Sequence, residues 1–460
     1  MQATSDSLLI RNIHTLVTMD AEDRQICDGY IYVENGEIRE LGARPHNGLQ
    51  AARTIDAATC IAIPGLINTH HHLFQTLTRA VAKAADAELF DWLKTLYPIW
   101  ARIDEEATHV AALVGMAELM MSGCTTTSDH HYLFPRGQME LIDAEISAAQ
   151  TIGMRFHATR GSMSVGESKG GLPPDCVVQD EDTILADCER VIGKFHDPRR
   201  GAMVRIALAP CSPFSVSGQL MRDTAELAER HDVRLHTHLA ETRDEERYCI
   251  ERFGQRPLDF MESVGWMSAR TWVAHGIHFT ANEVERLGKA AVGVAHCPTS
   301  NMRLGSGLAP ALALSRAGSP VGLGVDGSAS NDSSNMLNEV RQALLLNRLG
   351  HGAGAITVKQ ALRMATLEGA RCLGRDDIGS LEVGKRADIA LFDLNTLAYS
   401  GAEDPLSALL LCFPSPVHTL VIDGRVVVES GSLNSVNVLT VIEHHRRVVS
   451  RITGKRTTLC

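Results

Sequence analysis

Two pairs of histidines in this 460-residue sequence have a spacing that suits metal binding. His70 and His72 lie two residues apart, and so do His236 and His238. In an extended strand, residues two apart project from the same face, so both imidazoles of a pair can reach one ion. A polar turn is the alternative interpretation of the first pair, and the spacing alone does not decide which histidine of the second pair binds.

Two carboxylates complete the set of groups that bind metals or move protons. Asp326 lies in the glycine-rich run GLGVDGS, where glycine allows the backbone to approach closely. Glu241 lies three residues beyond His238, where it can hold or shuttle a proton without joining the ligands. Three histidines and one aspartate favour a catalytic zinc ion that keeps one position open for water.

The elements that must position these residues are short β-branched runs that alternate with helical segments. Helices are predicted after most of the runs, for example over residues 105–122 and 218–231. Such alternation is typical of βα units and a parallel sheet, and eight units favour a closed barrel. The eight predicted strands are residues 61–68, 125–129, 155–159, 204–209, 234–238, 271–275, 293–296 and 321–326.

The ends of these strands predict where the site lies. In a barrel of this kind, the C-terminal strand ends form the active-site face. Six of the eight runs end on His or Asp or lead directly into one, which is more than chance placement of titratable groups would give. These residues are His70 with His72, Asp129, His238, His275, His296 and Asp326.

The two ends of the chain predict a second, smaller β domain. A hairpin with an Asn-Gly turn is expected near residues 29–38, and strands are expected over 387–394 and 419–428. The predicted fold class is therefore α/β, with a (β/α)8 TIM-type barrel and a small β-sandwich domain formed by both chain ends. The expected domains are the sandwich at 1–62 and 378–435, the barrel at 63–377 and a C-terminal helical tail at 436–460.

Composition and charge exclude several classes of partner. The net charge of −11 provides no basic surface for nucleic acid or anionic lipid. The first residues lack the pattern of a signal peptide, and no apolar stretch is long enough to span a bilayer. Eleven cysteines, none in a CxxC pair, favour the reducing cytoplasm. We therefore expect a cytoplasmic protein with a small-molecule substrate and with neither nucleic acid nor a membrane as partner.

Five motifs, in order along the chain, resemble the amidohydrolase superfamily and, within it, the aminohydrolase branch. They are PGLINTHHH at 64–72, HLAE at 238–241, VAH at 273–275, HCPTSN at 296–301 and GVDG at 324–327. Further stretches are similar to the group of bacterial 8-oxoguanine deaminases and hydroxyatrazine ethylaminohydrolase-like proteins. These are NTHHH at 68–72, SDHHYLF at 128–134, TRGSMS at 159–164, APCSPF at 209–214 and GSASND at 327–332.

The resemblance implies the ligands and the proton-moving groups. It assigns His70, His72, His238 and Asp326 to the metal, which makes His236 a supporting residue. It makes Glu241 the proton shuttle and His275 the group that polarises the attacking water or the departing amine, while Asp326 also accepts a proton.

A single metal ion is expected. Residues 209–211 contain no lysine, whereas binuclear members of the superfamily need a bridging carboxylated lysine there. The expected cofactor is one divalent metal per chain, Zn²⁺ first, with Fe²⁺ and Mn²⁺ as alternatives. The resemblance to the aminohydrolase branch also implies a homo-oligomer.

The implied activity is a zinc-dependent hydrolytic deamination of an oxidised purine, 8-oxoguanine and water giving urate and ammonia. The alternative is a related heterocycle: isoxanthopterin, a hydroxy-s-triazine, guanine or cytosine. Two other hypotheses remain at this point. One is a hydrolase that opens a cyclic amide, and the other is a non-catalytic assembly protein that kept the barrel.

Three residues near the strand ends are candidates for substrate contact. The carboxamide of Gln75 offers a donor and an acceptor for the amide edge of a purine or pteridine. Arg160 is expected either to contact a carbonyl oxygen of the substrate or to close a structural salt bridge. Cys211 is expected to pack near the substrate without acting as a nucleophile. Trp92 and Trp100 are expected in the core, with a platform for stacking on the substrate as the alternative.

Overall fold

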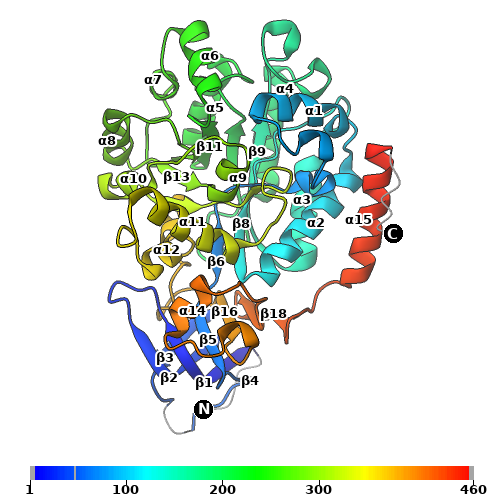
Figure 1. The fold of residues 1–460 in the computed structure, drawn as a ribbon. Coiled ribbons are helices and arrows are strands. Elements are labelled where there is room, and N and C mark those ends of the chain that lie inside the picture. Colours follow the sequence, from blue (N-terminus) through cyan, green and yellow to red (C-terminus); the bar gives the residue numbers. More distant parts are fainter. Residues whose placement is uncertain (1–5, 46–47, 455–460) are drawn as a thin grey trace.

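The computed structural model describes residues 6–45 and 48–454, and its centre is a closed barrel of eight parallel strands (Figure 1). Each strand pairs with the next along the chain, and the last pairs with the first. The predicted barrel is therefore confirmed. Its strands are β6 (Leu66–Asn68), β8 (Cys124–Ser128), β9 (Arg155–Ser162), β10 (Val204–Pro210), β11 (Arg234–Leu239), β12 (Thr271–His275), β13 (Gly293–His296) and β14 (Val321–Leu323).

Helices follow every barrel strand and surround the barrel (Figure 1). The main apolar core fills the space between the two layers, where Phe156 and Ile206 of the strands pack with Ile184 and Leu220 of the helices. The helices are α1 (Leu89–Trp100), α2 (Glu105–Met121), α3 (Leu141–Ile152), α4 (Glu181–Phe195), α5 (Gly218–Arg230), α6 (Arg243–Phe253), α7 (Pro257–Ser263), α8 (Ala281–Lys289), α9 (Pro298–Arg303), α10 (Ala311–Ala317), α11 (Met336–His351), α12 (Val358–Met364) and α13 (Leu367–Cys372).

The chain ends together build the predicted β domain, which lies beyond one end of the barrel (Figure 1). Its strands form one continuous nine-stranded sheet, in which strands from the two ends pair antiparallel where β16 meets β5. The strands are β1 (Ser7–Val17), β2 (Gln25–Glu34), β3 (Glu37–Gly42), β4 (Arg53–Asp56), β5 (Cys60–Pro64), β16 (Ile389–Asp393), β17 (Thr419–Ile422), β18 (Arg425–Glu429) and β19 (Ser432–Leu433). Helix α14 (Pro405–Leu411) lies between β16 and β17 in the chain.

The predicted strand over residues 61–68 is two strands that belong to different domains. β5 pairs with β1 and β16 in the sheet, whereas β6 pairs with β8 and β14 in the barrel. Gly65 lies between them, and a Cβ atom there would come within 2.2 Å of Thr125. A side chain would clash there, so only glycine fits between the two strands. Because β5 and β6 are separated by this single residue, the chain passes from one domain to the other without a linker.

The helix α15 (Val438–Thr453) packs against the barrel rather than the sheet (Figure 1). Val448 and Ile452 are buried in an apolar cluster that also contains Trp100. Arg451 forms an ion pair with Asp104, the residue that caps the N-terminus of α2. The expected tail at 436–460 is helical over this range, and residues 455–460 lie outside the described residues. None of the helices in the described part of the chain is both long and apolar enough to cross a bilayer.

Candidate metal centre and active-site cavity

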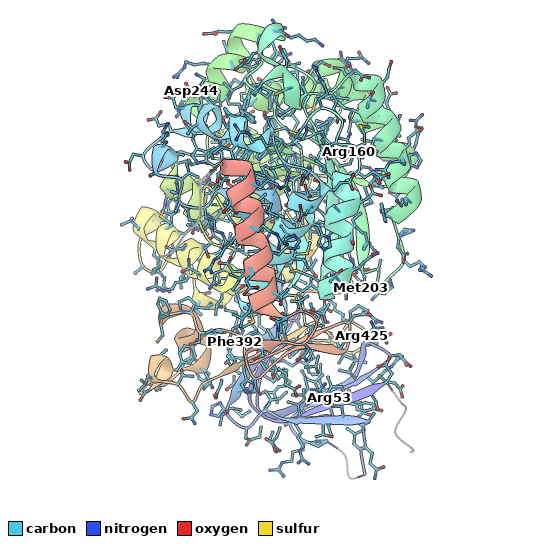
Figure 2. The ribbon with its side chains drawn as sticks, turned by 90° about the vertical axis from the view of Figure 1, so that its right-hand side faces the viewer. Arg53, Arg160, Met203, Asp244, Phe392 and Arg425 are labelled. Atoms are coloured by element: carbon cyan, nitrogen blue, oxygen red, sulfur yellow. The ribbon has the colours of Figure 1, made fainter. Side chains whose placement is uncertain are left out.

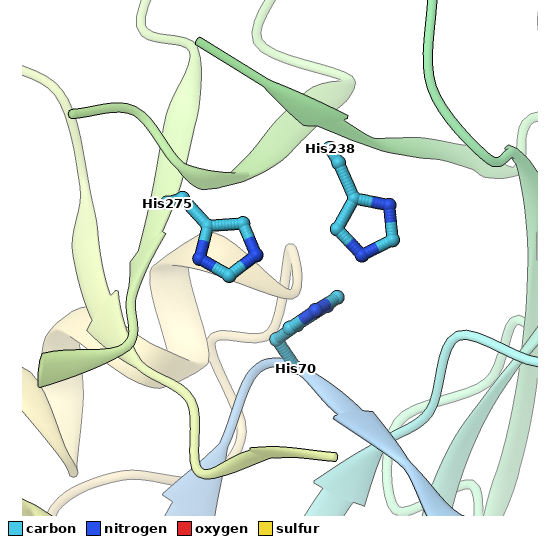
Figure 3. A group of neighbouring side chains, drawn as sticks. All are labelled: His70, His238 and His275. Atoms are coloured by element: carbon cyan, nitrogen blue, oxygen red, sulfur yellow. The ribbon is translucent and has the colours of Figure 1, made fainter. Parts of the chain in front are cut away.

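Side chains from five strands or strand ends converge at one end of the barrel. His70 comes from the segment after β6, His238 from β11 and His275 from the end of β12, and Figure 3 shows the three rings facing a common space. His72, in the two-residue strand β7 (His71–His72), and Asp326, in β15 (Asp326–Gly327), join the same cluster. All five side chains are buried.

The separations between the ligand atoms fit one metal ion. His72 Nε2 lies 3.1 Å from His238 Nε2, and Asp326 Oδ1 lies 3.2 Å from His72 Nε2 and 3.3 Å from His70 Nε2. Two tetrahedral ligands at ordinary zinc distances are ~3.3 Å apart. These three separations are close to the spacing of ligands around one tetrahedral ion.

The protonation of two histidines also calls for a cation between them. His72 Nδ1 donates to the carbonyl oxygen of His130 at 2.8 Å, and His238 Nδ1 donates to that of Cys211 at 2.7 Å. A carbonyl can only accept, so these nitrogens carry the hydrogens, and in the neutral rings both Nε2 atoms present lone pairs to each other. A metal ion satisfies both lone pairs at once.

His70 is oriented by a longer chain of hydrogen bonds. His70 Nδ1 lies 2.8 Å from His236 Nε2, and His236 Nδ1 donates to the carbonyl oxygen of Trp272 at 2.9 Å. This chain directs His70 Nε2 into the cluster, where it is buried without a hydrogen-bond partner. Histidine ligands are commonly fixed in this way by a partner on the other ring nitrogen. His236 thus lies behind the ligand set.

Backbone geometry at the strand ends places the two remaining groups. β15 pairs with β7, which sets Asp326 opposite His71 and beside His72. Both Asp326 (φ 61°) and His275 (φ 70°) adopt the left-handed conformation. That conformation costs free energy in residues with a Cβ atom, and such strain is concentrated at functional sites.

Burial and charge favour different protonation states for the two carboxylates. Burial raises the pKa of Asp326, but the imidazoles of His70, His72 and His275 around it outweigh burial and hold that pKa well below its usual value. Burial, together with the charge of Asp326, raises the pKa of Glu241 well above its usual value. Burial lowers the pKa values of His70 and His238. One carboxylate is thus ionised at the ligand position while the other is poised to carry a proton.

Glu241 and His275 are held next to each other by their own partners. Glu241 Oε2 lies 3.6 Å from His275 Nε2. His275 Nδ1 donates to Asn301 Oδ1 at 3.0 Å, and Glu245 accepts the backbone N–H of Glu241 at 3.0 Å. Sequence reasoning missed the supporting roles of Asn301 and Glu245, although Asn301 ends the HCPTSN motif.

A narrow cavity opens onto this cluster and encloses about 420 Å³ of empty space, part of it open to solvent. Gln75 and Cys211 line it, as do Glu241 and three residues of the cluster, His72, His238 and Asp326. Burial raises the pKa of Cys211 to about 12, so its thiol stays neutral. The walls of the cavity are aromatic: Trp92, for which stacking was the alternative to the core, and Tyr97, Tyr132 and Phe214, which sequence reasoning missed. Their signal was weak because aromatic residues at helical spacing are more often core.

Three predicted residues lie away from the cavity. Arg160 is fully buried, pairs with Asp187 at 2.6 Å and does not line the cavity, so its placement matches the structural salt bridge rather than substrate contact. Asp129 and His296 are buried at their strand ends but do not join the ligand cluster.

The sequence comparisons agree with this geometry. The amidohydrolase family model matches residues 61–427. The chain is 53% identical to 8-oxoguanine deaminase of Pseudomonas aeruginosa, over 96% of this chain and 98% of that protein. It is 40% identical to hydroxydechloroatrazine ethylaminohydrolase of Pseudomonas sp. strain ADP, over 92% of this chain and 91% of that protein.

A solved structure shows the same fold over almost the whole chain. It is atrazine chlorohydrolase from Arthrobacter aurescens TC1 complexed with zinc, and it superposes with a TM-score of 0.92 at 33% identity. The match covers 96% of this chain and 100% of that one. The barrel and the added β domain therefore occur together in a zinc-containing relative.

Proposed function

The chain belongs to the amidohydrolase family, and we propose that it is a metal-dependent deaminase whose substrate is 8-oxoguanine, converted with water to urate and ammonia. The observation that carries the catalytic part is the pair of Nε2 lone pairs of His72 and His238, which face each other at 3.1 Å beside Asp326. A cluster of this kind, next to Glu241 and open to a cavity, supports hydrolysis at a carbon that bears an amine.

The proposed cofactor is one Zn²⁺ per chain, held by His70, His72, His238 and Asp326, with Fe²⁺ and Mn²⁺ as alternatives. When bound, such an ion lowers the pKa of a water ligand to about 7 and polarises the reacting group. The zinc of the solved relative supports this assignment. The absence of lysine at residues 209–211 supports a single ion.

The protein's own groups move the protons. Asp326, kept ionised by its neighbours, accepts a proton from the attacking water. Because His275 gives its Nδ1 hydrogen to Asn301, its Nε2 is free to accept a hydrogen bond from that water and orient it. Glu241, protonated, donates to the ring nitrogen beside the amine-bearing carbon. Asp326 then passes the proton taken from water to the amine nitrogen, so that the carbon–nitrogen bond breaks with ammonia as the leaving group. The ionised Glu241 takes the hydroxyl proton from the same carbon, which leaves a carbonyl and restores both carboxyl groups to their starting states.

Gln75 is proposed to recognise the purine edge. Its Oε1 accepts the backbone N–H of Ala329 at 3.3 Å, which leaves the Nε2 donors for the cavity. A Cβ atom at Gly327 would come within 1.8 Å of that Oε1, so glycine lets the carboxamide lie flat against the backbone. A donor in this place suits a carbonyl oxygen or an unprotonated ring nitrogen of the substrate.

The aromatic walls suit a flat bicyclic ring, and the 53% identity to an 8-oxoguanine deaminase favours that purine. The second candidate is a hydroxy-s-triazine, which the 40% identity to a hydroxydechloroatrazine ethylaminohydrolase favours. Isoxanthopterin, guanine and cytosine complete the set of alternatives.

Cytoplasmic location and self-association are part of the same proposal. All ten cysteines among the described residues are free thiols, which suits a reducing compartment. Leu349, Leu397 and Phe413 are exposed apolar side chains that offer surface to a second copy. Light scattering tests this, and a monomeric mass at micromolar concentration contradicts it.

Metal content and ammonia release together test the class of enzyme. We expect one tightly held divalent ion per chain, ammonia release that stops on chelation, and recovery when zinc is restored. Ring opening without ammonia would instead indicate a cyclic amide hydrolase. A protein that holds no metal and releases no ammonia would be a non-catalytic member. Two tightly held ions in the fully active protein would contradict the single-ion assignment.

A further inference from the structure

A second cavity lies at the opposite end of the barrel from the metal centre. It is formed at the N-terminal ends of β9 to β12, near the β domain. Figure 2 marks the two ends: Met203, just before β10, lies toward the β domain, and Asp244 of α6 lies at the far end. The cavity is lined by His157, His196, Pro198, Arg205, Ile206, Asp232, Val233, Arg234, Ala269, Arg270 and Gly374.

Two arginines in this lining carry charges without a partner of opposite sign. Arg205 donates to the carbonyl oxygens of Pro198, Arg199 and Gly374 at 3.1 to 3.3 Å, and Arg234 donates to that of Cys372 at 2.8 Å. The Nε of each is buried and has no hydrogen-bond partner. Within residues 6–45 and 48–454, no carboxylate forms an ion pair with either guanidinium.

The nearby carboxylates are already held by other cations. Asp232 pairs with Arg270 at 2.8 Å, and Asp197 pairs with Arg199 at 2.8 Å. Asp376 pairs with Arg200 at 3.1 Å, and Asp377 pairs with Arg375 at 2.7 Å. Arg205 and Arg234 therefore give this cavity a positive charge that the neighbouring protein groups do not neutralise by direct pairing.

His157 adds neutral hydrogen-bonding capacity to the same cavity. Its side chain projects from β9 with only 4% of its surface exposed, and neither ring nitrogen has a partner. Burial and the neighbouring arginines lower the pKa of His157 well below its usual value, so the ring has one donor and one acceptor nitrogen at neutral pH. A buried imidazole with two unused nitrogens is costly unless something binds it.

We propose that this cavity binds a small oxyanion of the phosphate class, either inorganic phosphate or the phosphoryl group of a small metabolite. Both guanidinium groups are partly buried, and each has a buried Nε without a hydrogen-bond partner, so a bound anion would supply the missing acceptor and the opposite charge. Donors from Arg205, Arg234 and His157 approach from different strands, which suits a tetrahedral oxyanion. Arg270 also lines the cavity, but its guanidinium is already paired with Asp232.

The test is calorimetry of the metal-loaded protein in sodium phosphate and in sodium chloride of equal ionic strength. We expect phosphate to raise the Tm by about 2 °C or more at saturation, and titration to show one site per chain besides any at the metal centre. Arg234→Met and Arg205→Met should each weaken that binding at least tenfold. In chloride, each variant should be no less stable than the wild type, because a positive charge without a carboxylate partner is lost.

Arg200→Met is the matched control, since Arg200 is an exposed arginine outside the cavity that pairs with Asp376. It should keep the full response to phosphate.

A wild-type Tm equal in the two salts would overturn the proposal. So would an unchanged phosphate response in both cavity variants, which would place the anion at the metal centre or show an adventitious ion only. If one cavity variant does not fold, the other variant and the wild-type Tm values in the two salts still test the proposal. Parallel titrations with inorganic phosphate and with a sugar phosphate distinguish the two sources.

Discussion

At the residue scale, the assignment of Glu241 as the proton carrier rests on its position beside His275 and on its raised pKa. Glu241→Gln keeps the size and hydrogen bonds of the side chain but cannot exchange a proton. We expect turnover to fall by at least ~10²-fold while metal content stays near normal. His238→Ala is the contrasting variant, which should lose the metal. Wild-type turnover in Glu241→Gln would show that the shuttle is another group.

Gln75 is the residue-scale test of substrate recognition. Gln75→Ala should lower kcat/KM for 8-oxoguanine by roughly 10-fold or more without releasing the metal, because the lost donor leaves a substrate acceptor unpaired. Steady-state kinetics with metal analysis checks this. Arg160→Met is the matched comparison: it removes a buried ion pair remote from the cavity, so it should lower the Tm and leave the KM of the folded enzyme near normal. An unaltered kcat/KM in Gln75→Ala would remove Gln75 from the substrate site.

The residues that bind the proposed metal were predictable because they lie at strand ends with two-residue spacing. The supporting roles of Asn301 and Glu245 were not, since a hydrogen bond such as His275 to Asn301 joins side chains 26 residues apart. Spacing left His236 and His238 equivalent, because both project from the same face of β11. Their contacts separate them: His238 Nε2 lies 3.1 Å from His72 Nε2, whereas His236 Nε2 lies 2.8 Å from His70 Nδ1. Arg160 was ambiguous for the same reason: its partner Asp187 lies 27 residues away.

At the element scale, helix α3 is joined to the loop after β8 by a buried pair. Glu145 Oε1 lies 2.8 Å from His131 Nδ1, and Asp129, nearby, accepts the backbone N–H of Leu73 at 2.7 Å. Burial raises the pKa of Glu145 to about 8. This network connects α3 to the backbone that follows the ligand His72, so it steadies the strand end that carries the ligand.

Because its folded-state pKa is raised, Glu145 binds more protons in the folded protein than in the unfolded chain between about pH 4.5 and 8. Its contribution to the free energy of unfolding is present below this window and is lost as the pH rises through it. Glutamine cannot titrate, so Glu145→Gln should not lose stability in this way. We expect its free energy of unfolding, relative to that of the wild type, to rise by roughly 1–3 kcal/mol from pH 5 to pH 8.

Urea unfolding at several pH values measures this difference. Glu189→Gln, at an exposed glutamate of α4, serves as the control and should follow the wild type. If the free energies of unfolding of the wild type and of Glu145→Gln changed with pH by the same amount, the raised pKa of Glu145 would be contradicted.

Most elements could be predicted from periodicity and turn residues, and the helices over 105–122 and 218–231 are observed within one residue at their ends. The sequence predicts one strand over residues 321–326 and gives no sign that it is divided into two. In the structure it ends as β14 at Leu323, and Asp326 begins the separate pair with β7. Gly324 allows this break because His70 packs where its Cβ atom would lie, at 2.7 Å. Such close contacts depend on the tertiary fold and leave no periodic pattern in the sequence.

At the scale of the whole molecule, the barrel separates two chemically different ends. The end away from the β domain carries the histidine and aspartate cluster, and the end near it carries the arginine-lined cavity. Sequence reasoning predicted the barrel and the β domain because strand runs flank a βα repeat. The second cavity was not predictable, since Arg205, Arg234 and His157 come from three strands and have no common motif.

The measurement that tests the central claim most directly is ammonia release by the zinc-loaded protein from a panel of 8-oxoguanine, guanine, isoxanthopterin, cytosine and a hydroxy-s-triazine. A site built to hydrogen-bond one polar edge can reject analogues that lack it by up to ~10⁴-fold. We predict that 8-oxoguanine gives equal amounts of urate and ammonia, with kcat/KM at least ~10²-fold above that for guanine. Equal turnover of guanine, or turnover of the triazine or pterin alone, would contradict the substrate assignment, and ammonia from none of the five would contradict the proposed deaminase activity.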